Sequence, residues 1–138
     1  MTSDARPLPV PDADSAEFWK AGKGQALRLQ RCRDCWTFRH YARAYCPDCL
    51  SSETEWVTAS GRGTVYSFAV VHRAFHPAFK DDVPYVVALI DLEEGPRMLS
   101  DLRDCPPEEA AIEMRVEVFF EDAPGGLSIP HFRPAKAS

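Results

Sequence analysis

No apolar run in the sequence approaches the roughly 20 residues that a membrane-spanning helix needs. The chain also lacks a Gly-rich phosphate loop, a nucleophile-elbow motif and any pair of residues whose spacing alone implies a nucleophile and a base. Its 138 residues carry a formal net charge of -5, which argues weakly against a nucleic-acid partner. These absences predict a soluble, cytoplasmic protein without membrane contact and without catalytic residues of its own.

Cysteine is scarce, yet four of the five cysteines form two C-x-x-C motifs separated by ten residues: Cys32, Cys35, Cys46 and Cys49. Two thiolates three positions apart can bind one ion because a tight turn points both sulfurs inward, and a second turn completes a tetrahedron. Four sulfur ligands leave no open coordination position, so the expected metal is a structural Zn(2+) ion. Iron in a rubredoxin-like site is the alternative, because the same four thiolates bind either ion.

Other roles for these cysteines fit the sequence less well. Two disulfides would suit an oxidising compartment, but no hydrophobic signal segment opens the chain. A redox-active C-x-x-C needs one motif rather than two. Cys105 stands alone and is interpreted as a small apolar residue.

The first predicted element is a short helix over residues 16–21, which Gly22 and Gly24 are expected to end. Phe18 and Trp19 are adjacent, so a helix of this length cannot bury both on one stripe. They are expected to dock either on this protein's own core or on another subunit. The second is favoured, which makes the two residues a candidate partner-docking pair.

Alternating residues at 27–31 and 52–57 predict one strand leading into the cysteine motifs and one leading away from them. After residue 61 the chain is expected to be β throughout. The nearly continuous apolar run at 85–91 is expected to be a strand buried on both faces. Five short strands with one helix between the third and the fourth match an OB-fold Greek-key barrel. The strands are predicted at residues 64–71, 85–91, 97–102, 115–120 and 127–132, and the helix at 106–112.

The predicted fold class is therefore mainly β, with an N-terminal helix, a zinc ribbon and then a five-stranded OB-fold Greek-key barrel. The expected domain organisation is listed from the amino terminus. It comprises an N-terminal extension and short helix at 1–26, the zinc ribbon at 27–58, the barrel at 59–134 and a tail at 135–138.

The connection between the first two barrel strands, residues 72–84, is the predicted recognition loop, because OB-folds commonly form their ligand face with loops at this position. Its basic residues could hold a phosphate and its phenylalanines could cover an apolar chain, although a loop folded onto its own barrel would also use them. A metal site at its two histidines is disfavoured, because Pro77 removes the helical face that would align them. The candidate substrate- or partner-facing residues are His72, Arg73, Phe75, His76, Phe79 and Lys80.

Several sequence blocks, in this order, resemble one known family. Over residues 15–134 the chain is similar to the OB-fold acyl-CoA-associated proteins with an N-terminal rubredoxin-like zinc ribbon, long catalogued as a domain of unknown function. The blocks are Phe18-Trp19, Leu29 to Cys32, Tyr45 to Cys49, Gly61 to Ser67, Val71 to Pro77, Val83 to Val87, Leu92 to Arg97 and Val116 to Phe120.

This resemblance implies an accessory, non-catalytic role in CoA-thioester metabolism within a heteromeric complex. Members of the family occur with thiolase-like enzymes, including lipid-transfer-protein-like subunits that act as thiolases or as aldolases on steroid side chains. Others occur with MaoC-like enoyl-CoA hydratases, which are the alternative partner. In such complexes the partner supplies the catalytic residues, while the zinc-ribbon subunit helps to shape a shared acyl-CoA site.

Two positions depart from the family pattern. Many relatives have glycine after the first C-x-x-C and before the fourth barrel strand, where this chain has Trp36 and Glu113. Because such a glycine often serves a positive φ angle, the two turns are expected to differ locally while the metal site survives.

A single-stranded nucleic-acid binder is the rival class, because zinc ribbons and OB-folds both serve that purpose and Tyr66 and Phe68 could stack bases. Residues 91–122 hold eleven acids against three arginines, however, so the barrel lacks the basic stripe that phosphate binding requires. The basic residues gather instead at 20–43. There they could meet the phosphates of CoA or offset the negative charge of a zinc ion held by four thiolates.

Overall fold

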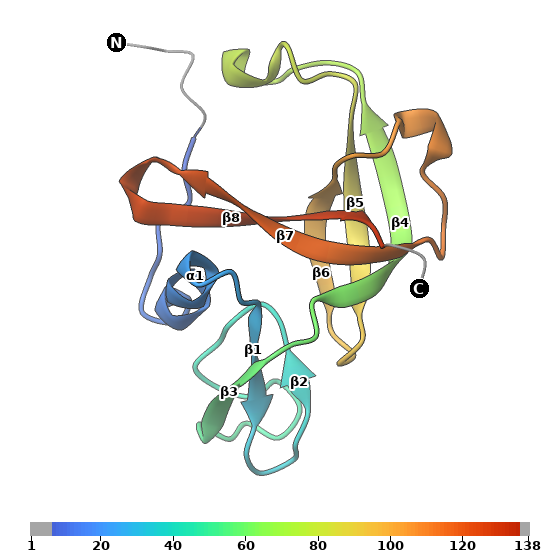
Figure 1. Cartoon of the computed structure of the whole chain (residues 1–138). Helices are drawn as coiled ribbons and strands as arrows, with labels where there is room; N and C mark the ends of the chain where they lie inside the picture. The colour runs from blue at the N-terminus through green and yellow to red at the C-terminus, as the bar shows by residue number, and fades with distance from the viewer. Residues whose placement is uncertain (1–6, 136–138) are drawn as a thin grey trace.

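A computed structural model describes residues 7–135 and contains one helix, a small sheet and a closed barrel (Figure 1). The predicted fold class is confirmed. The helix is α1 (Ala16–Lys23), and the small sheet contains β1 (Arg28–Cys32), β2 (Phe38–Arg39) and β3 (Thr54–Thr58). The barrel contains β4 (Arg62–Val71), β5 (Tyr85–Leu92), β6 (Arg97–Leu102), β7 (Arg115–Ala123) and β8 (Leu127–Pro134). Three 3-10 turns lie at Pro77–Phe79, Pro107–Glu109 and Pro124–Gly126.

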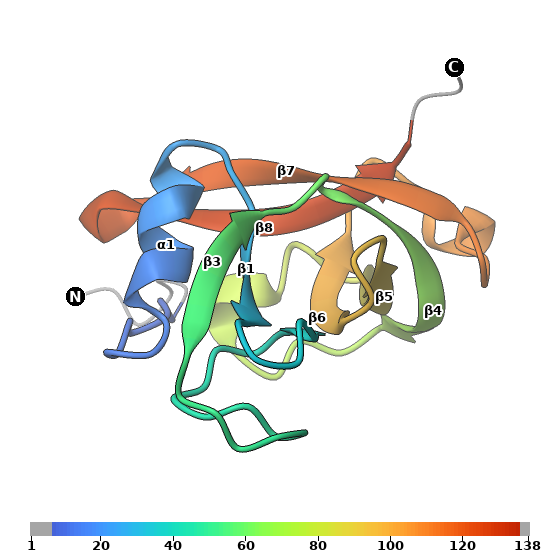
Figure 2. The same cartoon turned by 90° about the horizontal axis from the view of Figure 1, so that it is seen from below.

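Helix α1 packs on β8 and on β1, and it continues through Gly22 to Lys23 (Figure 2). Gly22 and Gly24 were expected to end the helix: Gly24 is the C-cap residue, whereas Gly22 lies within the helix and is buried against the barrel, so the prediction is wrong for Gly22. A Cβ atom at Gly22 would lie 3.2 Å from the Ser128 carbonyl oxygen. The absence of a side chain there lets the helix approach β8 closely.

The small sheet has the order β2-β1-β3, so β1 is its central strand. Leu27 and Leu29 are almost fully buried beneath it. Arg28 connects this sheet to α1, because its guanidinium donates to Glu17 at 2.6 Å and to the Trp56 carbonyl oxygen at 2.7 Å. The two elements that precede the barrel are therefore joined by charge as well as by apolar contact.

The barrel closes in the order β4-β5-β6-β8-β7, which is the strand order of an OB-fold. Its interior is filled by apolar residues from all five strands, among them Val65, Ile90, Met98, Val116 and Phe132. Strands β6 and β8 have fewer paired positions than any other neighbouring strands of the barrel, with the single pair Leu102–Phe132. A cleft borders this edge of the barrel.

Strand β5 alternates between buried and half-buried residues, so the expectation of burial on both faces is wrong. Val86, Ala88 and Ile90 point into the barrel, whereas Val87 and Leu89 lie on its outer face. A strand in a barrel of this size has one interior face, and its outer face here is covered only in part.

The helix expected at 106–112 is also wrong, because only a 3-10 turn forms at Pro107–Glu109. Ala110, directly after it, is extended, with φ -65° and ψ 136°. The turn ends at Ala110, and Glu113 N–H bonds to the Val65 carbonyl oxygen at 2.7 Å rather than to a carbonyl of its own segment. This tie draws the segment back to the barrel before a second helical turn could form.

No helix among residues 7–135 is long and apolar enough to cross a membrane.

The small sheet ends at Thr58 and the barrel begins at Arg62. The predicted N-terminal extension lies in part outside the described residues, and so does nearly all of the predicted tail at 135–138.

Candidate metal centre

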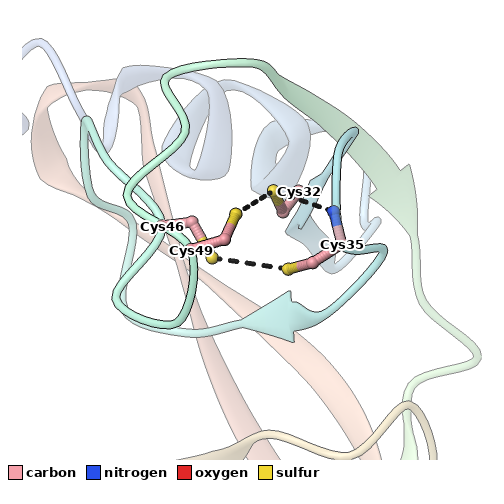
Figure 3. Close-up of side chains that lie close together, drawn as sticks. All are labelled: Cys32, Cys35, Cys46 and Cys49. Carbon is pink, nitrogen blue, oxygen red and sulfur yellow. Dashed lines mark hydrogen bonds between the residues drawn. The ribbon is translucent and has the colours of Figure 1, made fainter.

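The four predicted cysteine ligands meet at one point at the end of the small sheet (Figure 3). All four sulfur atoms lie within 4.8 Å of one another, with Cys32 Sγ 3.5 Å from Cys49 Sγ and Cys35 Sγ 3.6 Å from Cys46 Sγ. A tetrahedral ion with metal–sulfur bonds of about 2.3 Å requires sulfur separations of about 3.8 Å. The cysteines therefore fit a four-coordinate thiolate site.

The two knuckles that carry these cysteines have the same backbone hydrogen bonds. In the first, Cys32 N–H donates to the Thr37 carbonyl oxygen at 3.0 Å and Trp36 N–H donates to the Cys32 carbonyl oxygen at 2.9 Å. In the second, Cys46 N–H donates to Ser51 and Leu50 N–H donates to Cys46, both at 2.8 Å. This repeated turn directs each pair of sulfur atoms toward the other pair.

The surroundings of the sulfur atoms favour a bound cation. The Cys35 backbone N–H, opposed by burial, lowers the pKa of Cys32 to about 6. Although the Ser51 backbone N–H favours the thiolate of Cys49, the neighbouring Cys32 raises the pKa of Cys49 to about 12. Four thiolates this close repel one another unless a cation lies among them, so the donor set fits a divalent metal.

The turns at Trp36 and Glu113 do not differ from those that glycine would form, and the expectation of a local change is wrong. Trp36 has a φ of 63° and Glu113 a φ of 70°, both in the left-handed region. Each knuckle or turn imposes this angle through its hydrogen bonds, whatever residue occupies the position. Leu50, the counterpart of Trp36 in the second knuckle, has a φ of 65°.

The two predicted docking residues, Phe18 and Trp19, go to different places. Phe18 is 8% exposed and packs within this protein's own core, which is one of the two destinations that the sequence left open. Trp19 is half-buried and lines a cleft of about 450 Å³ between α1, the β2–β3 loop, β6 and β8. The same cleft is lined by Tyr41, Leu99, Ile129, Pro130 and His131.

Four of the six candidate residues in the recognition loop are exposed, and the other two, His76 and Phe79, are half-buried. His72, Arg73, Phe75 and Lys80 are exposed, with Phe75 at 83% exposure and the Arg73 guanidinium 5.8 Å from its ring centre. His76 instead accepts a hydrogen bond from Ala78 N–H at its Nδ1 atom, which begins the 3-10 turn at Pro77. Phe79 packs between His76 and Tyr85, with ring centres 6.1 Å from each.

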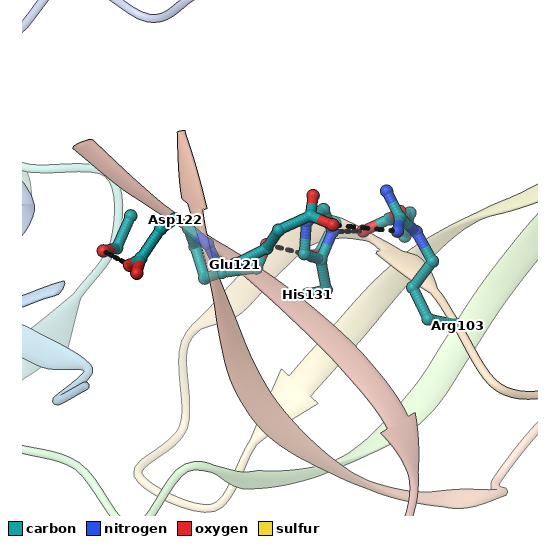
Figure 4. Close-up of polar contacts among 8 residues, drawn as sticks. Arg103, Glu121, Asp122 and His131 are labelled. Atoms are coloured by element: carbon teal, nitrogen blue, oxygen red, sulfur yellow. Dashed lines mark hydrogen bonds and ion pairs between the residues drawn. The ribbon is translucent and has the colours of Figure 1, made fainter. Parts of the chain in front are cut away.

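A charged cluster between β6, β7 and β8 was missed by the sequence analysis (Figure 4). His131 Nδ1 lies 2.6 Å from Asp101 and its Nε2 lies 3.3 Å from Glu121, while Arg103 donates to Asp101 at 2.6 Å. Burial would raise the pKa of Asp101, but hydrogen bonding to His131 and Arg103 holds it below its usual value. The cluster joins the strands where the barrel has its thinnest backbone pairing.

The family of the chain follows from two matches that together span most of the described residues. A model described as the ChsH2 rubredoxin-like zinc ribbon domain matches residues 19–55, and one described as the ChsH2 C-terminal OB-fold domain matches residues 56–121. The chain belongs to the ChsH2 family. Its members share the two-part architecture of a zinc ribbon followed by an OB-fold.

Named relatives of the ChsH2 family include subunits and scaffold proteins. A probable enoyl-CoA hydratase alpha subunit of Thermomonospora curvata is 42% identical over 94% of this chain, which spans only 40% of that protein's length. A DUF35 domain-containing scaffold protein of Methanocaldococcus jannaschii is 41% identical over 70% of this chain and 72% of its own. The benzoylsuccinyl-CoA thiolase subunit BbsA of Geobacter metallireducens is 33% identical over 64% of this chain and 58% of its own.

One solved structure is similar along nearly the whole chain. A chain of the Ltp2-ChsH2(DUF35) aldolase superimposes with a TM-score of 0.83 and 40% sequence identity. The match covers 92% of this chain and 98% of that one. The name of that structure gives two components, and two of the relatives above are named as subunits.

Proposed function

We propose that this chain is a non-catalytic accessory subunit of an acyl-CoA-processing complex. Its partner is a thiolase-like subunit that acts either as a thiolase or as a retro-aldolase. The observation that carries the proposal is the similarity, over 98% of its length, to the ChsH2 chain of an aldolase named for two components. The BbsA relative, named as a thiolase subunit, supports the same class of partner.

The metal in this proposal is a structural Zn(2+) ion held by Cys32, Cys35, Cys46 and Cys49. Four thiolates fill a tetrahedral coordination sphere, so the ion has no position left for a substrate. Its contribution is to the folding of the small sheet, because a module of this size has little apolar core of its own.

The contacts of the reactive side chains support an accessory role. Both ring nitrogens of His131 face carboxylates, of Asp101 and Glu121, so neither is directed at the cleft as a base. Burial, with Glu109 and Glu108 nearby, raises the pKa of Cys105, which keeps this residue a thiol and a poor nucleophile. The catalytic groups of the complex are therefore assigned to the partner.

The contribution of this chain to the acyl-CoA site is assigned to the exposed part of the recognition loop. Arg73 and Lys80 carry charge that a phosphate of CoA could meet, and Phe75 presents an uncovered ring beside Arg73. A side chain as exposed as Phe75 gains little in the isolated subunit, which is consistent with a role at a shared site.

A MaoC-like enoyl-CoA hydratase is the second candidate partner. The observation that favours it is the identity of 42% to a probable enoyl-CoA hydratase alpha subunit. The two partners differ in reaction, because a hydratase adds water to a double bond whereas a thiolase or aldolase cleaves a carbon–carbon bond.

Co-purification from native cell extract tests the proposal. Tagged wild-type protein is recovered, its partners are identified by mass spectrometry and the eluate is analysed for zinc and iron. A thiolase-like chain in stoichiometric amount supports the main proposal, and a hydratase chain supports the second. Recovery of the protein alone, or with single-stranded nucleic acid, would contradict both.

A further inference from the structure

Two large apolar residues occupy equivalent strained positions beside the metal site. Trp36 follows Cys35 and Leu50 follows Cys49, and both have left-handed backbone angles, with φ of 63° and 65°. A residue with a Cβ atom loses free energy in this region that glycine does not lose. Trp36 is nevertheless 57% exposed and Leu50 75% exposed, so little burial offsets this strain in the isolated subunit, although the Arg31 guanidinium carbon lies over the Trp36 ring at 4.7 Å from its centre.

The other strained positions in the described chain are of a different kind. Gln25, Asp104 and Glu113 are the remaining non-glycine residues with positive φ among residues 7–135, and all three are polar and exposed. Exposure of these polar side chains to water costs no free energy, unlike exposure of a large apolar side chain. The exposed, strained residues that are large and apolar thus both lie at the tips of the metal knuckles.

A third aromatic residue and two arginines lie in the same segment. Tyr45, next to Cys46, is 63% exposed. Arg33 and Arg43 are exposed and form no ion pair within residues 7–135. Trp, Tyr and Arg are the residue types that most often dominate the energetics of protein interfaces.

We propose that the knuckle tips, defined as Trp36, Tyr45 and Leu50 with Arg33 and Arg43, form the docking surface for the catalytic subunit. This inference rests on the proposed function, which supplies a partner. Asp34 and Asp48 are exposed in the same two knuckles, so the patch has an apolar centre and a rim of both charges, and the matching partner surface is apolar with a rim of mixed charge. The catalytic subunit is the expected occupant because the similar solved chain belongs to an aldolase named for two components.

Glycine substitutions test this proposal because they separate stability from binding. Trp36→Gly and Leu50→Gly keep the left-handed turn, and Leu50→Gly removes an exposed side chain at no loss of core contacts. Glu113→Gly is the matched control, since it changes a residue of the same backbone type away from the knuckles. Each variant is assayed for zinc content, unfolding temperature and affinity for the catalytic subunit identified with the wild-type protein.

We expect all three variants to bind zinc as the wild type does, with unfolding temperatures no lower than that of the wild type for Leu50→Gly and Glu113→Gly. Trp36→Gly and Leu50→Gly are each expected to weaken the complex by about tenfold or more, as loss of an interface anchor does. Glu113→Gly should leave the affinity unchanged.

The outcomes distinguish this proposal from the one on which it rests. If both knuckle variants bind the catalytic subunit as tightly as the wild type, the docking surface is wrong and the proposed function stands. If the wild type binds no thiolase-like or hydratase chain, both proposals fall. If the substitutions instead dissociate a homodimer seen by sedimentation of the wild type alone, the occupant is a second copy and the assignment is overturned.

Discussion

The backbone N–H of Leu99, on β6 of the barrel, donates a hydrogen bond to the Tyr41 hydroxyl, in the loop after β2, at 3.1 Å. The two residues come from the two parts of the chain and are 58 positions apart. The Leu99 N–H is on the edge of β6 that pairs with β8 at one position, Leu102–Phe132, so this N–H has no partner on β8. The Tyr41 hydroxyl supplies the acceptor that a neighbouring strand would otherwise provide.

Replacing Tyr41 by Phe should therefore lower the free energy of unfolding by about 0.5–1 kcal/mol, since Leu99 N–H would exchange its protein acceptor for water. Chemical denaturation of the zinc-loaded protein measures this change. Tyr45→Phe serves as the control, because the hydroxyl of Tyr45 has no hydrogen-bond partner among residues 7–135. Equal stability of the two variants would mean that the Tyr41 contact does not hold the two parts together.

Removal of the metal should unfold the small sheet. Cys32→Ser or Cys49→Ser deletes one of the four ligands, and in metal-dependent modules the free energy of metal binding is also free energy of folding. Metal analysis and circular dichroism should show loss of zinc and of β structure, with the same change when a chelator is added to the wild type. Cys105→Ser should keep both zinc and structure. A metal-free Cys32→Ser protein that stays folded and still forms the complex would rule out this role.

Much of the fold was predictable because its local signals agree. The spacing of the cysteines specified the metal site, and the turn at residues 93–96 placed the start of β6 at its observed position. The missed features depend on contacts between distant segments. The His131 cluster needs β6, β7 and β8 side by side, and no spacing in the sequence relates Asp101 to His131.

Gly22, and two positions where relatives have glycine, misled the sequence analysis for a related reason. Gly22 has the local character of a helix stop, but its buried contact with β8 makes it a packing residue. Trp36 and Glu113 suggested altered turns, but the hydrogen bonds of the first knuckle fix the backbone at Trp36, and a bond to the distant Val65 carbonyl oxygen fixes it at Glu113. Tertiary contacts overrode local preference at Gly22 and Glu113, and the hydrogen bonds of the metal knuckle did so at Trp36.

The pH dependence of stability should reveal His40, which packs against Phe18 and Tyr41 with ring centres at 5.2 Å and 4.2 Å. Burial lowers the pKa of His40 from 6.5 to about 4. Between these values the unfolded chain binds a proton that the folded chain excludes, so stability is full above pH 6.5 and falls as the pH falls toward 4. The loss attributable to His40 is about 2–3 kcal/mol.

A His40→Gln variant should lose less stability than the wild type between pH 7 and pH 5, measured by denaturation with zinc content followed in parallel. The lowered pKa of Asp101 acts below this window, because its usual value is 3.8. An NMR titration of the wild type provides the direct measurement. A His40 pKa near 6.5 in the folded protein would contradict the burial argument.

The recognition loop should affect the complex and not the isolated subunit. Phe75 is 83% exposed, and the exposed Arg73 forms no side-chain hydrogen bond or ion pair among residues 7–135 and lies beside the Phe75 ring, so Phe75→Ala and Arg73→Ala should leave the unfolding temperature unchanged. If this loop forms part of the acyl-CoA site, the reconstituted complex should show a KM for acyl-CoA raised about tenfold by loss of a charged contact to phosphate or of an apolar cover.

Phe79→Ala is the contrasting variant. Its ring packs against Tyr85, so it should lower stability first, and any kinetic effect should follow from that. Unchanged KM and kcat in both Arg73→Ala and Phe75→Ala complexes would remove the loop from the site and leave the subunit's contribution to docking alone.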